Sequence, residues 1–371
     1  MAKGFLGAAG TAALAVAAWL AAHVAIHCPI QPEGPWPPRP SAVDRFPPNN
    51  LLQNLEKLGE GRLSGPEDVY VDAAGEVYTA TRDGWVQRMR ANGSWERWGF
   101  VGGPRLLGIA PSADGAMLVC DTDKGLLKLE ENGRVTLLAS VVEDSTIRLA
   151  NTAIEASDGT VYFSDVSTRF SFDNWFLDFL EHRFTGRLLK YDPRAGKASV
   201  VLNGLGFANG VALSPDEAFV VVCETMRFRC SKVCLKGDNA GQAEIFVDNL
   251  PGNPDNIRLG SDGHFWIALL QLRFSPWLDL VAHWSLTRRV IASFPALTER
   301  AKAMVKGAMV AQVSVNGEIM RVLGDSDGKV SSLVTSVTEF NGDLFLGSLT
   351  ANFIGKLSLD KVPQQQGDAI P

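Results

Sequence analysis

The sequence predicts an all-β protein, and specifically a six-bladed β-propeller. The main observation is a repeat that combines a short apolar strand, an Asp-Gly or Asn-Gly type turn, and a second strand rich in β-branched and aromatic residues. This is the pattern of a β-hairpin. Where no insertion intervenes, copies start at intervals of roughly 40 residues, which is the period of propeller blades. A content of 36 glycines and 46% hydrophobic residues suits many short buried strands joined by tight turns. The six copies lie at residues 65–78, 107–119, 151–163, 209–222, 255–267 and 334–346.

Most hairpins are followed by further strands, so each repeat predicts a four-stranded blade. Third strands are expected at residues 84–90, 125–129, 186–191 and 355–359, and fourth strands at 199–202 and 243–247. A closed ring leaves only short sheet edges exposed. We expect residues 55–63 to supply the strand that closes it by completing the last sheet. Residues 51–362 are therefore predicted to form one propeller domain, followed by a tail at 363–371.

The amino-terminal segment predicts a membrane anchor. Residues 4–26 are almost continuously apolar and follow Lys3, and about 20 such residues can span a bilayer. No Ala-x-Ala type boundary follows, so an uncleaved signal anchor over residues 1–28 is favoured over a cleaved signal peptide. A type II anchor would place the propeller in the endomembrane lumen, in the endoplasmic reticulum or vacuole, whereas a cleaved peptide would give a soluble secretory protein. The proline-rich residues 29–50 predict an extended linker.

The net charge limits the classes of binding partner, and the cysteine spacing limits the possible disulfides. A net charge of -6 with no basic run argues against nucleic acid as a partner. The five cysteines show no disulfide framework or metal-thiolate spacing. Cys120 and Cys223 are expected to be buried thiols, while Cys230 and Cys234 could pair only through a local turn. Asn92 opens an Asn-Gly-Ser glycosylation acceptor on a predicted turn, which would suit a lumenal glycoprotein.

Two insertions interrupt the blade pattern, and both are predicted to be amphipathic helices. Residues 173–184 and 276–305 carry apolar side chains at helical spacing. We expect them to form lids over one end of the ring. The lid aromatic residues could line an apolar cavity, touch a membrane or pack on the propeller. His182, on the first insertion, is a secondary candidate for a catalytic base.

The candidate functional site comes from matched positions in four repeats. Glu67, Asn151, Asn209 and Asp255 each open the first strand of a different hairpin. The innermost strands of a propeller converge on its central channel, so these oxygen atoms should meet there. Together with Asn256 they suit Ca²⁺. The alternative is that they cap turns and bind neighbouring blades through hydrogen bonds.

Asp121 and Asp165 each begin the turn after a second strand. These two carboxylates are candidate channel-lining residues, and a structural role in the turns is an equally good interpretation.

At these positions the chain resembles a superfamily of six-bladed propellers. Its members include strictosidine synthase, the plant strictosidine synthase-like proteins, adipocyte plasma membrane-associated protein, paraoxonases and gluconolactonase-like enzymes. The resemblance covers roughly residues 50–360 and is nearest to the strictosidine synthase-like proteins, which also carry an amino-terminal anchor. The segments that carry it are 65–67, 162–167, 186–193, 207–214 and 254–257.

The resemblance implies two chemistries, and this chain departs from both. Strictosidine synthase condenses tryptamine with an aldehyde, secologanin, and uses a glutamate as acid and base in its last blade. That position is Thr335 here, and a threonine hydroxyl cannot carry protons near neutral pH. Glu339 is close in sequence but should lie at a different depth along its strand. Strictosidine synthesis is therefore the less favoured chemistry for this chain.

Paraoxonases, by contrast, are calcium-dependent lactonases and esterases. The resemblance implies that their catalytic calcium ligands are retained. A second, structural calcium is less well supported, because Asp68 matches one ligand while Thr152 stands where an aspartate is expected. The position of their histidine base is Leu107. The implied calcium ligands are Glu67, Asn151, Asn209, Asp255 and Asn256.

The sequence thus predicts metal-assisted hydrolysis of an ester or a lactone, with a small molecule as substrate and Asp255 as the base. Two alternatives stay open. One is a Pictet-Spengler condensation of the strictosidine synthase type. The other is a non-catalytic scaffold or small-molecule carrier tethered to the membrane by the amino-terminal anchor.

Overall fold

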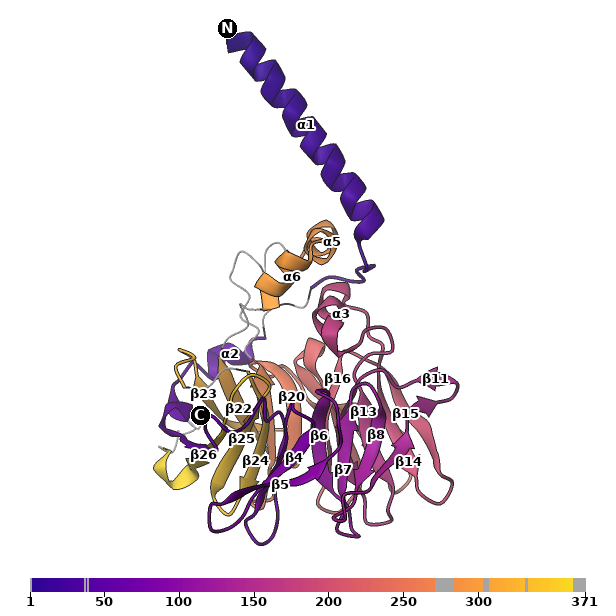
Figure 1. Ribbon diagram of the computed structural model, residues 1–371, viewed down its shortest axis with the longest axis vertical. Helices are drawn as coiled ribbons and strands as arrows, with labels where there is room; N and C mark the ends of the chain where they lie inside the picture. Colours follow the sequence, from indigo (N-terminus) through magenta and orange to yellow (C-terminus); the bar gives the residue numbers. More distant parts are fainter. Residues whose placement is uncertain are drawn as a thin grey trace. The chain divides into compact units, whose positions relative to one another are not determined.

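The chain forms two compact units. The structure, a computed structural model, describes residues 2–36, 38, 40–270, 283–302, 307–330 and 333–362, with side chains from Thr11 onward. The helical unit comprises Met1–Trp36, Asn174–Arg183 and Arg273–Met304. The propeller unit comprises Pro37–Asp173, Phe184–Leu272 and Val305–Pro371 (Figure 1). The predicted tail at 363–371 and residues 276–282 and 303–305 of the second insertion lie outside the described residues.

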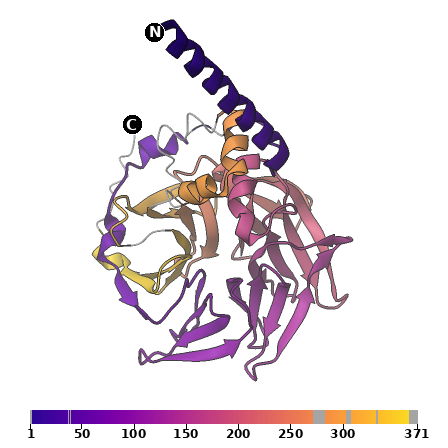
Figure 2. The same ribbon diagram turned by 45° about the horizontal axis from the view of Figure 1, so that its top comes forward.

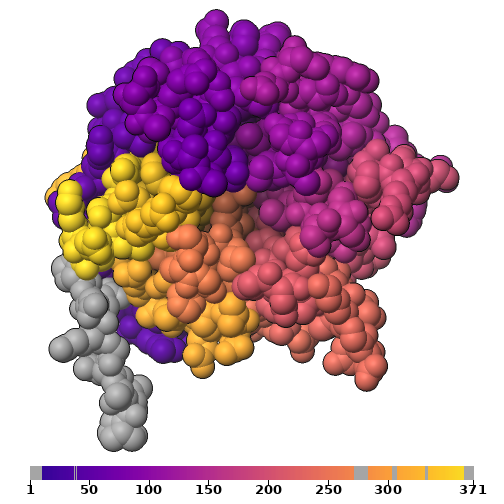
Figure 3. Space-filling view, turned by 90° about the horizontal axis from the view of Figure 1, so that it is seen from below, coloured from indigo at the N-terminus to yellow at the C-terminus, as the bar shows by residue number. Residues whose placement is uncertain are grey.

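Six four-stranded antiparallel sheets make up the propeller unit, as the repeat predicted. They follow one another around a ring in chain order, and the yellow last blade lies beside the indigo first one (Figures 2 and 3). From the inner strand outward the blades are β2 (Val69–Val71), β3 (Val77–Ala80), β4 (Trp85–Met89) and β5 (Trp95–Phe100); β6 (Leu106–Pro111), β7 (Met117–Asp121), β8 (Gly125–Leu129) and β9 (Val135–Ala139); β12 (Ala150–Glu155), β13 (Val161–Asp165), β14 (Gly186–Asp192) and β15 (Lys197–Leu205); β16 (Ala208–Leu213), β17 (Phe219–Glu224), β18 (Arg229–Cys234) and β19 (Ala243–Val247); β20 (Asn253–Leu259), β21 (Phe265–Leu270), β22 (Ala308–Val313) and β23 (Ile319–Asp325); and β24 (Val334–Phe340), β25 (Asp343–Ser348), β26 (Ile354–Ser358) and β1 (Glu56–Leu58).

The ring closes through the amino-terminal strand, which confirms the prediction for residues 55–63. β1 pairs antiparallel with β26, and Lys57 lies opposite Gly355. The last sheet is thereby completed by the other end of the chain. Opening the ring at this blade would break the hydrogen bonds between β1 and β26. Short elements fill the connections: α2 (Ala42–Arg45), η1 (Leu51–Asn54), η2 (Phe172–Asn174), η3 (Thr225–Arg227), η4 (Leu359–Lys361), and the β10 (Val141–Val142) and β11 (Ser145–Thr146) ribbon.

The hydrophobic core lies between adjacent blades. Each sheet turns apolar side chains toward both of its neighbours, and the buried clusters cross blade boundaries. Phe246 on the fourth blade packs against Phe265 on the fifth, with ring centroids 5.2 Å apart. Leu63 and Val69 of the first blade meet Phe345 of the last. Burial of this apolar surface is the main stabilising contribution to the ring.

The helical unit joins the amino-terminal helix to both insertions. It contains α1 (Ala2–His27), α3 (Trp175–Glu181), α5 (Ser285–Ser293) and α6 (Pro295–Lys302). His23 stacks on Phe294 with ring centroids 4.4 Å apart. The buried Arg288 donates to the carbonyl oxygens of Leu180 and Gly34, at 3.3 and 2.8 Å. The helices predicted in the insertions are therefore present; α5 packs against α1, and α3 and α6 pack against α5.

The predicted membrane-spanning anchor is not supported. Residues 2–27 do form one helix, as the apolar run suggested. Within the described part of the chain, however, no helix is both long and apolar enough to cross a membrane.

One disulfide corrects the cysteine prediction. Cys223 on β17 lies directly opposite Cys230 on β18, and their sulfur atoms are bonded, with a Cα–Cα distance of 4.0 Å. Cys223 is therefore not a free buried thiol, and Cys230 does not pair with Cys234. The sequence reasoning missed the bond because the partner is set by cross-strand register rather than by spacing along one strand. Cys28, Cys120 and Cys234 are free.

Candidate metal site in the central channel

A β-bulge recurs at the same place in the inner strands of five blades. In β12, for example, pairing steps from Ala150 directly to Ala153 while the partner strand advances from Asp165 to Phe163, so two residues oppose one. Bulges of this kind re-aim side chains and are frequent next to active sites. The residues placed on these bulges are Leu107 and Gly108, Asn151 and Thr152, Asn209 and Gly210, Asp255 and Asn256, and Thr335. In the first blade, Glu67 and Asp68 immediately precede β2.

Glycines on the bulges allow neighbouring inner strands to approach closely. A Cβ added to Gly210 would lie 2.4 Å from the amide nitrogen of Ile257 and 2.6 Å from Cα of Asn256. A Cβ on Gly108 would lie 2.3 Å from the carbonyl oxygen of Asn151. Such distances are shorter than any side chain tolerates, so glycine at these positions is what lets the bulges of adjacent blades meet.

Hydrogen bonds join the five predicted ligands into two groups. Asn256 donates through Nδ2 to Oε1 of Glu67, at 3.1 Å. The Thr152 hydroxyl bonds to Oδ1 of Asn151 at 2.7 Å and also contacts Oδ1 of Asn256. Asn209 hydrogen-bonds the carboxyl group of Asp255. These side chains are at most 5% exposed. Residues up to 189 positions apart in sequence are thus brought into one buried polar cluster.

Electrostatics make this cluster costly without a cation. Burial raises the pKa of Glu67 well above its usual value, and the negative charges of Asp255 and Asp68 raise it further. Burial also raises the pKa of Asp255, while its hydrogen bond with Asn209 acts in the opposite direction. Both carboxyl groups therefore hold a proton more tightly than a free acid does, because burial outweighs the hydrogen bonds from Asn256 and Asn209.

Two buried oxygens in the cluster have no hydrogen-bond partner in the described structure: Oε2 of Glu67 and Oδ1 of Asn209. Buried polar atoms are rarely left unsatisfied, so these two suggest an absent ligand. A hard divalent cation would satisfy both, and the all-oxygen donor set suits Ca²⁺ or Mg²⁺ rather than zinc. Within the described residues no group of three or more His, Cys, Asp or Glu could hold a metal ion, so amide oxygens would have to complete this set.

Asp68 is already neutralised by the protein. Its carboxylate accepts from the amides of Val69 and Ile109, at 2.9 and 3.0 Å, and from Nη2 of Arg258, at 2.5 Å. The same Arg258 nitrogen lies 2.6 Å from the carbonyl oxygen of Ile109. Because two amides and a guanidinium already bind this carboxylate, the residues do not fit a second cation bound at Asp68. The guanidinium supplies the positive charge at this point.

The channel-lining candidates are engaged in local contacts. Asp121 accepts from the amides of Asp123 and Lys124, at 2.9 and 3.1 Å, and so closes the turn after β7. Asp165 accepts from the amide of Leu149 at 3.0 Å and pairs with Arg187 at 2.5 Å. These contacts correspond to the structural role in turns that the sequence left open.

His182 lies in the helical unit, where it ends α3 in a left-handed conformation with φ of 55°. Its ring is 6.0 Å from that of Trp36.

Thr335 and Glu339, which the sequence analysis weighed for an acid-base role, make structural contacts. The Thr335 hydroxyl donates to the carbonyl oxygen of Glu67, at 2.8 Å. Glu339 accepts from the Ser261 hydroxyl and from the amide of Gly342, both at 2.8 Å, at the opposite end of β24. The side chain at the position of the strictosidine synthase glutamate is therefore a hydroxyl bound to the backbone, and the nearby carboxylate of Glu339 lies at the other end of the strand.

Sequence reasoning missed the residues that support the ligands from outside the inner strands. Thr225, in η3 after β17, accepts a hydrogen bond from Nδ2 of Asn209 at 3.3 Å. Asn253 in turn donates to the Thr225 carbonyl oxygen at 2.8 Å. These contacts fix the orientation of the Asn209 amide, so that its oxygen is the free atom. The repeat pattern gave no signal for Thr225, since it lies in a connection that differs between blades.

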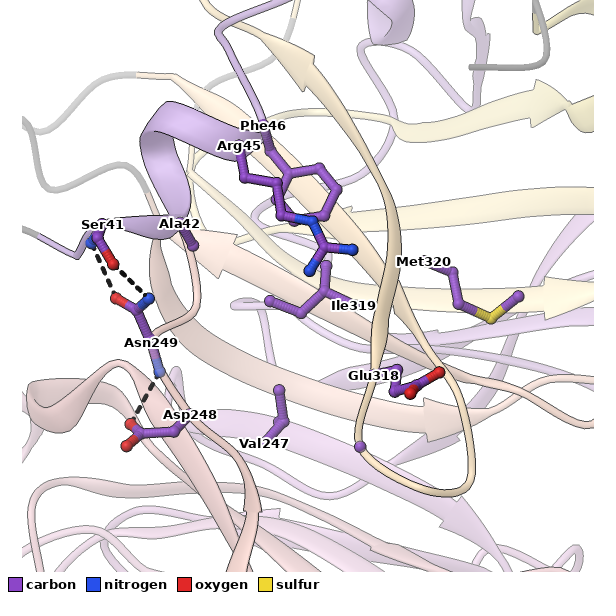
Figure 4. A pocket seen from close by; sticks show the side chains of 11 residues that line it. Ser41, Ala42, Arg45, Phe46, Val247, Asp248, Asn249, Glu318, Ile319 and Met320 are labelled. Atoms are coloured by element: carbon purple, nitrogen blue, oxygen red, sulfur yellow. Dashed lines mark hydrogen bonds between the residues drawn. The ribbon is translucent and has the colours of Figure 1, made fainter. Parts of the chain in front are cut away.

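A separate cavity of about 630 Å³ lies on the propeller unit, and none of its lining residues belongs to the channel cluster. It lies between α2, the segment after β19 and the turn between β22 and β23, and Figure 4 shows Arg45 and Phe46 facing Ile319 across it.

Comparison with known proteins identifies the family. The sequence profile of strictosidine synthase matches residues 151–238, and that of the strictosidine synthase-like amino-terminal region matches residues 44–89. Strictosidine synthase-like 4 from Arabidopsis thaliana is 33% identical over 339 residues, covering 88% of each chain. The chain belongs to the strictosidine synthase-like family.

Another relative of this strictosidine synthase-like protein is the adipocyte plasma membrane-associated protein of Mus musculus. It is 34% identical over 364 residues, which cover 92% of this chain and 87% of the mouse protein. The agreement therefore extends over nearly the whole sequence in both plant and animal relatives.

Solved structures share the fold at much lower identity. A gluconolactonase from Xanthomonas campestris superimposes with a TM-score of 0.57 at 15% identity, over 89% of this chain and 98% of its own. A calcium-binding regucalcin from Agrobacterium tumefaciens superimposes with a TM-score of 0.53 at 14% identity, over 81% and 92%. At these identities the likeness establishes the propeller architecture alone.

Proposed function

We propose that this strictosidine synthase-like protein is a divalent-metal-dependent hydrolase of esters or lactones. The observation that carries the proposal is the pair of orphaned buried oxygens, on Glu67 and Asn209, inside a cluster that also holds the buried carboxyl of Asp255. A purely structural channel would be more stable with apolar or fully paired residues there. Two proteins that share the fold, a gluconolactonase and a calcium-binding regucalcin, also support a metal-dependent hydrolase.

Each residue then has a distinct task. Glu67, Asn151, Asn209, Asp255 and Asn256 would hold the cation, which when bound supplies Lewis-acid polarisation of a carbonyl. Asn256 orients Glu67 through their hydrogen bond, and Thr225 orients Asn209. Asp255 is the candidate base, because burial raises its pKa above that of a free aspartate and so makes its carboxylate more basic.

The disulfide supports a lumenal or secreted location for this enzyme. Disulfides persist in oxidising compartments, and the buried Cys223–Cys230 bond would not be expected in a cytosolic protein. Asn92 lies exposed in the turn between β4 and β5, where a glycan could be accommodated. We accordingly propose that the propeller folds in the secretory pathway and is glycosylated at Asn92.

The direct test is Asn209→Ala. Loss of its amide oxygen should abolish Ca²⁺ binding, measured by calorimetry on metal-free protein, and should abolish Ca²⁺-dependent hydrolysis of aryl esters and lactones. Asn132→Ala, in an exposed turn, is the matched control and should change neither. Full turnover by Asn209→Ala would remove the proposed mechanism. Ca²⁺ binding by the wild type without turnover of any ester or lactone would favour the non-catalytic carrier.

Metal binding should also depend on pH in a defined direction. The folded-state pKa values of Glu67 and Asp255 are raised. Below the ordinary carboxyl pKa of about 4, these protonated groups contribute fully to the stability of the metal-free protein. That contribution is lost as the pH rises through the raised pKa values. Ca²⁺ requires the deprotonated acids. The gap between melting temperatures with Ca²⁺ and with EDTA should therefore widen from pH 5 to pH 8. A gap that stays constant across this range would contradict the assignment.

A further inference from the structure

Arg82 lies beside the segment that carries the first candidate ligand. It follows β3, in the turn that leads to β4, and its amide donates to the carbonyl oxygen of Ser64 at 2.8 Å. Its aliphatic stem passes over Gly65, where an added Cβ would lie 2.6 Å from Cδ of Arg82. Gly65 is two residues before Glu67, so the glycine lets the arginine stem pack against the approach to the site. The negative charge of Glu67 acts on Arg82 from this position.

The Arg82 guanidinium makes no direct ion pair with any described residue, although the negative charges of Asp173 and Glu67 act on it from a distance. It is half-buried and lies over the ring of Phe172, 4.9 Å from the centroid. Arg105 lies over the same ring at 5.7 Å, but it is paired bidentately with Asp173 at 2.7 and 2.8 Å. Within the described residues Arg82 has neither a side-chain hydrogen bond nor an ion pair, so its fork of N–H donors is free. A preorganised guanidinium of this kind is well suited to a planar carboxylate.

Arg82 stays charged, and the other cations on this side of the first two blades are already paired. Desolvation and the positive charge of Arg105 lower the pKa of Arg82, and the negative charges of Asp173 and Glu67 act in the opposite direction, so the guanidinium is charged at neutral pH. Lys124 and Arg105 are both ion-paired already, with Asp121 at 3.4 Å and with Asp173 at 2.7 Å. An incoming carboxylate would therefore find its free hydrogen-bond donors on Arg82.

We infer that Arg82 recognises a carboxylate on the substrate, so that the compounds hydrolysed carry an anionic group besides the ester or lactone. This inference rests on the proposed hydrolase function and names its substrate class. The scissile carbonyl would be held at the channel cluster while the carboxylate pairs with Arg82 beside it. The competing interpretation is that Arg82 only clamps Phe172 by a cation–π contact.

The test compares a matched pair of substrates, mono-4-nitrophenyl glutarate and 4-nitrophenyl valerate, at saturating Ca²⁺. Arg82→Met should lower kcat/KM for the glutarate ester by roughly 10- to 100-fold, mainly through KM, and should change the valerate ester less than about twofold. Arg82→Lys should recover part of the loss. Arg105→Met, which removes the other cation from Phe172, should leave the ratio between the two esters near that of the wild type.

The outcomes separate the two proposals. If both esters are hydrolysed and Arg82→Met keeps the wild-type ratio, or loses both activities equally, the inference is overturned while the hydrolase stands. If neither ester is hydrolysed, the hydrolase proposal fails. The role of Arg82 is then tested by the binding of glutarate. Calorimetry with glutarate at constant free Ca²⁺ should then show binding that is lost in Arg82→Met and kept in Arg105→Met. Equal binding by all three proteins would overturn the inference.

Discussion

Asp255→Asn is expected to reduce kcat/KM for Ca²⁺-dependent ester hydrolysis by about 10³-fold. The substitution keeps the size of the side chain and an oxygen that can accept from Asn209, but it removes the charge that would bind the cation and take a proton from water. Steady-state kinetics at several Ca²⁺ concentrations would measure the effect. Asp158→Asn, in an exposed hairpin turn of the third blade, is the matched control and should retain wild-type activity.

The same substitution should not destabilise the metal-free protein. Because burial raises the pKa of Asp255, its ionised form is disfavoured in the folded state, and a neutral amide removes that penalty. Denaturant unfolding in EDTA at pH 7.5 should therefore give a free energy of unfolding equal to or greater than that of the wild type. Loss of activity together with loss of stability would mean that Asp255 has a structural role only. Activity within tenfold of wild type would exclude it as ligand and base.

The propeller could be predicted from sequence because its hairpins are local. A turn such as Asp158-Gly159 and its flanking strands lie within about a dozen residues, so each copy carries its own signal. The channel ligands could be predicted for a related reason. Once the copies are aligned, Asn151 and Asn209 fall on the same position, and ring symmetry places equivalent positions around one axis.

The contacts that tune the site could not be predicted, since they join residues with no common period. Arg258 and Asp68 are 190 positions apart in sequence, and only closure of the ring brings the inner strand of the fifth blade close to that of the first. Arg82 is likewise informative only because its neighbours are known, since an arginine in a turn is ordinarily solvated. The β-bulges were also invisible, because a single extra residue leaves the alternating pattern of a short strand almost unchanged.

The buried pair of Arg258 and Asp68 predicts the largest effect on stability. Arg258→Met should lower the free energy of unfolding by about 3–5 kcal/mol, because it leaves the fully buried Asp68 carboxylate with backbone amides alone to compensate its charge. Arg134→Met removes a guanidinium that is 71% exposed and 3.8 Å from Glu130, and it should cost less than about 1 kcal/mol. Denaturant unfolding of both variants would measure the difference.

A double variant separates the charge from the packing of the arginine side chain. Asp68→Asn combined with Arg258→Met replaces the buried ion pair by neutral groups, so it should recover more than half of the stability lost in Arg258→Met alone. If the two substitutions were simply additive, the pair would not be coupled and the guanidinium would act only by filling space. Since Arg258 takes the place of a cation at Asp68, calorimetric titration of the wild-type protein should give one Ca²⁺ per propeller rather than two.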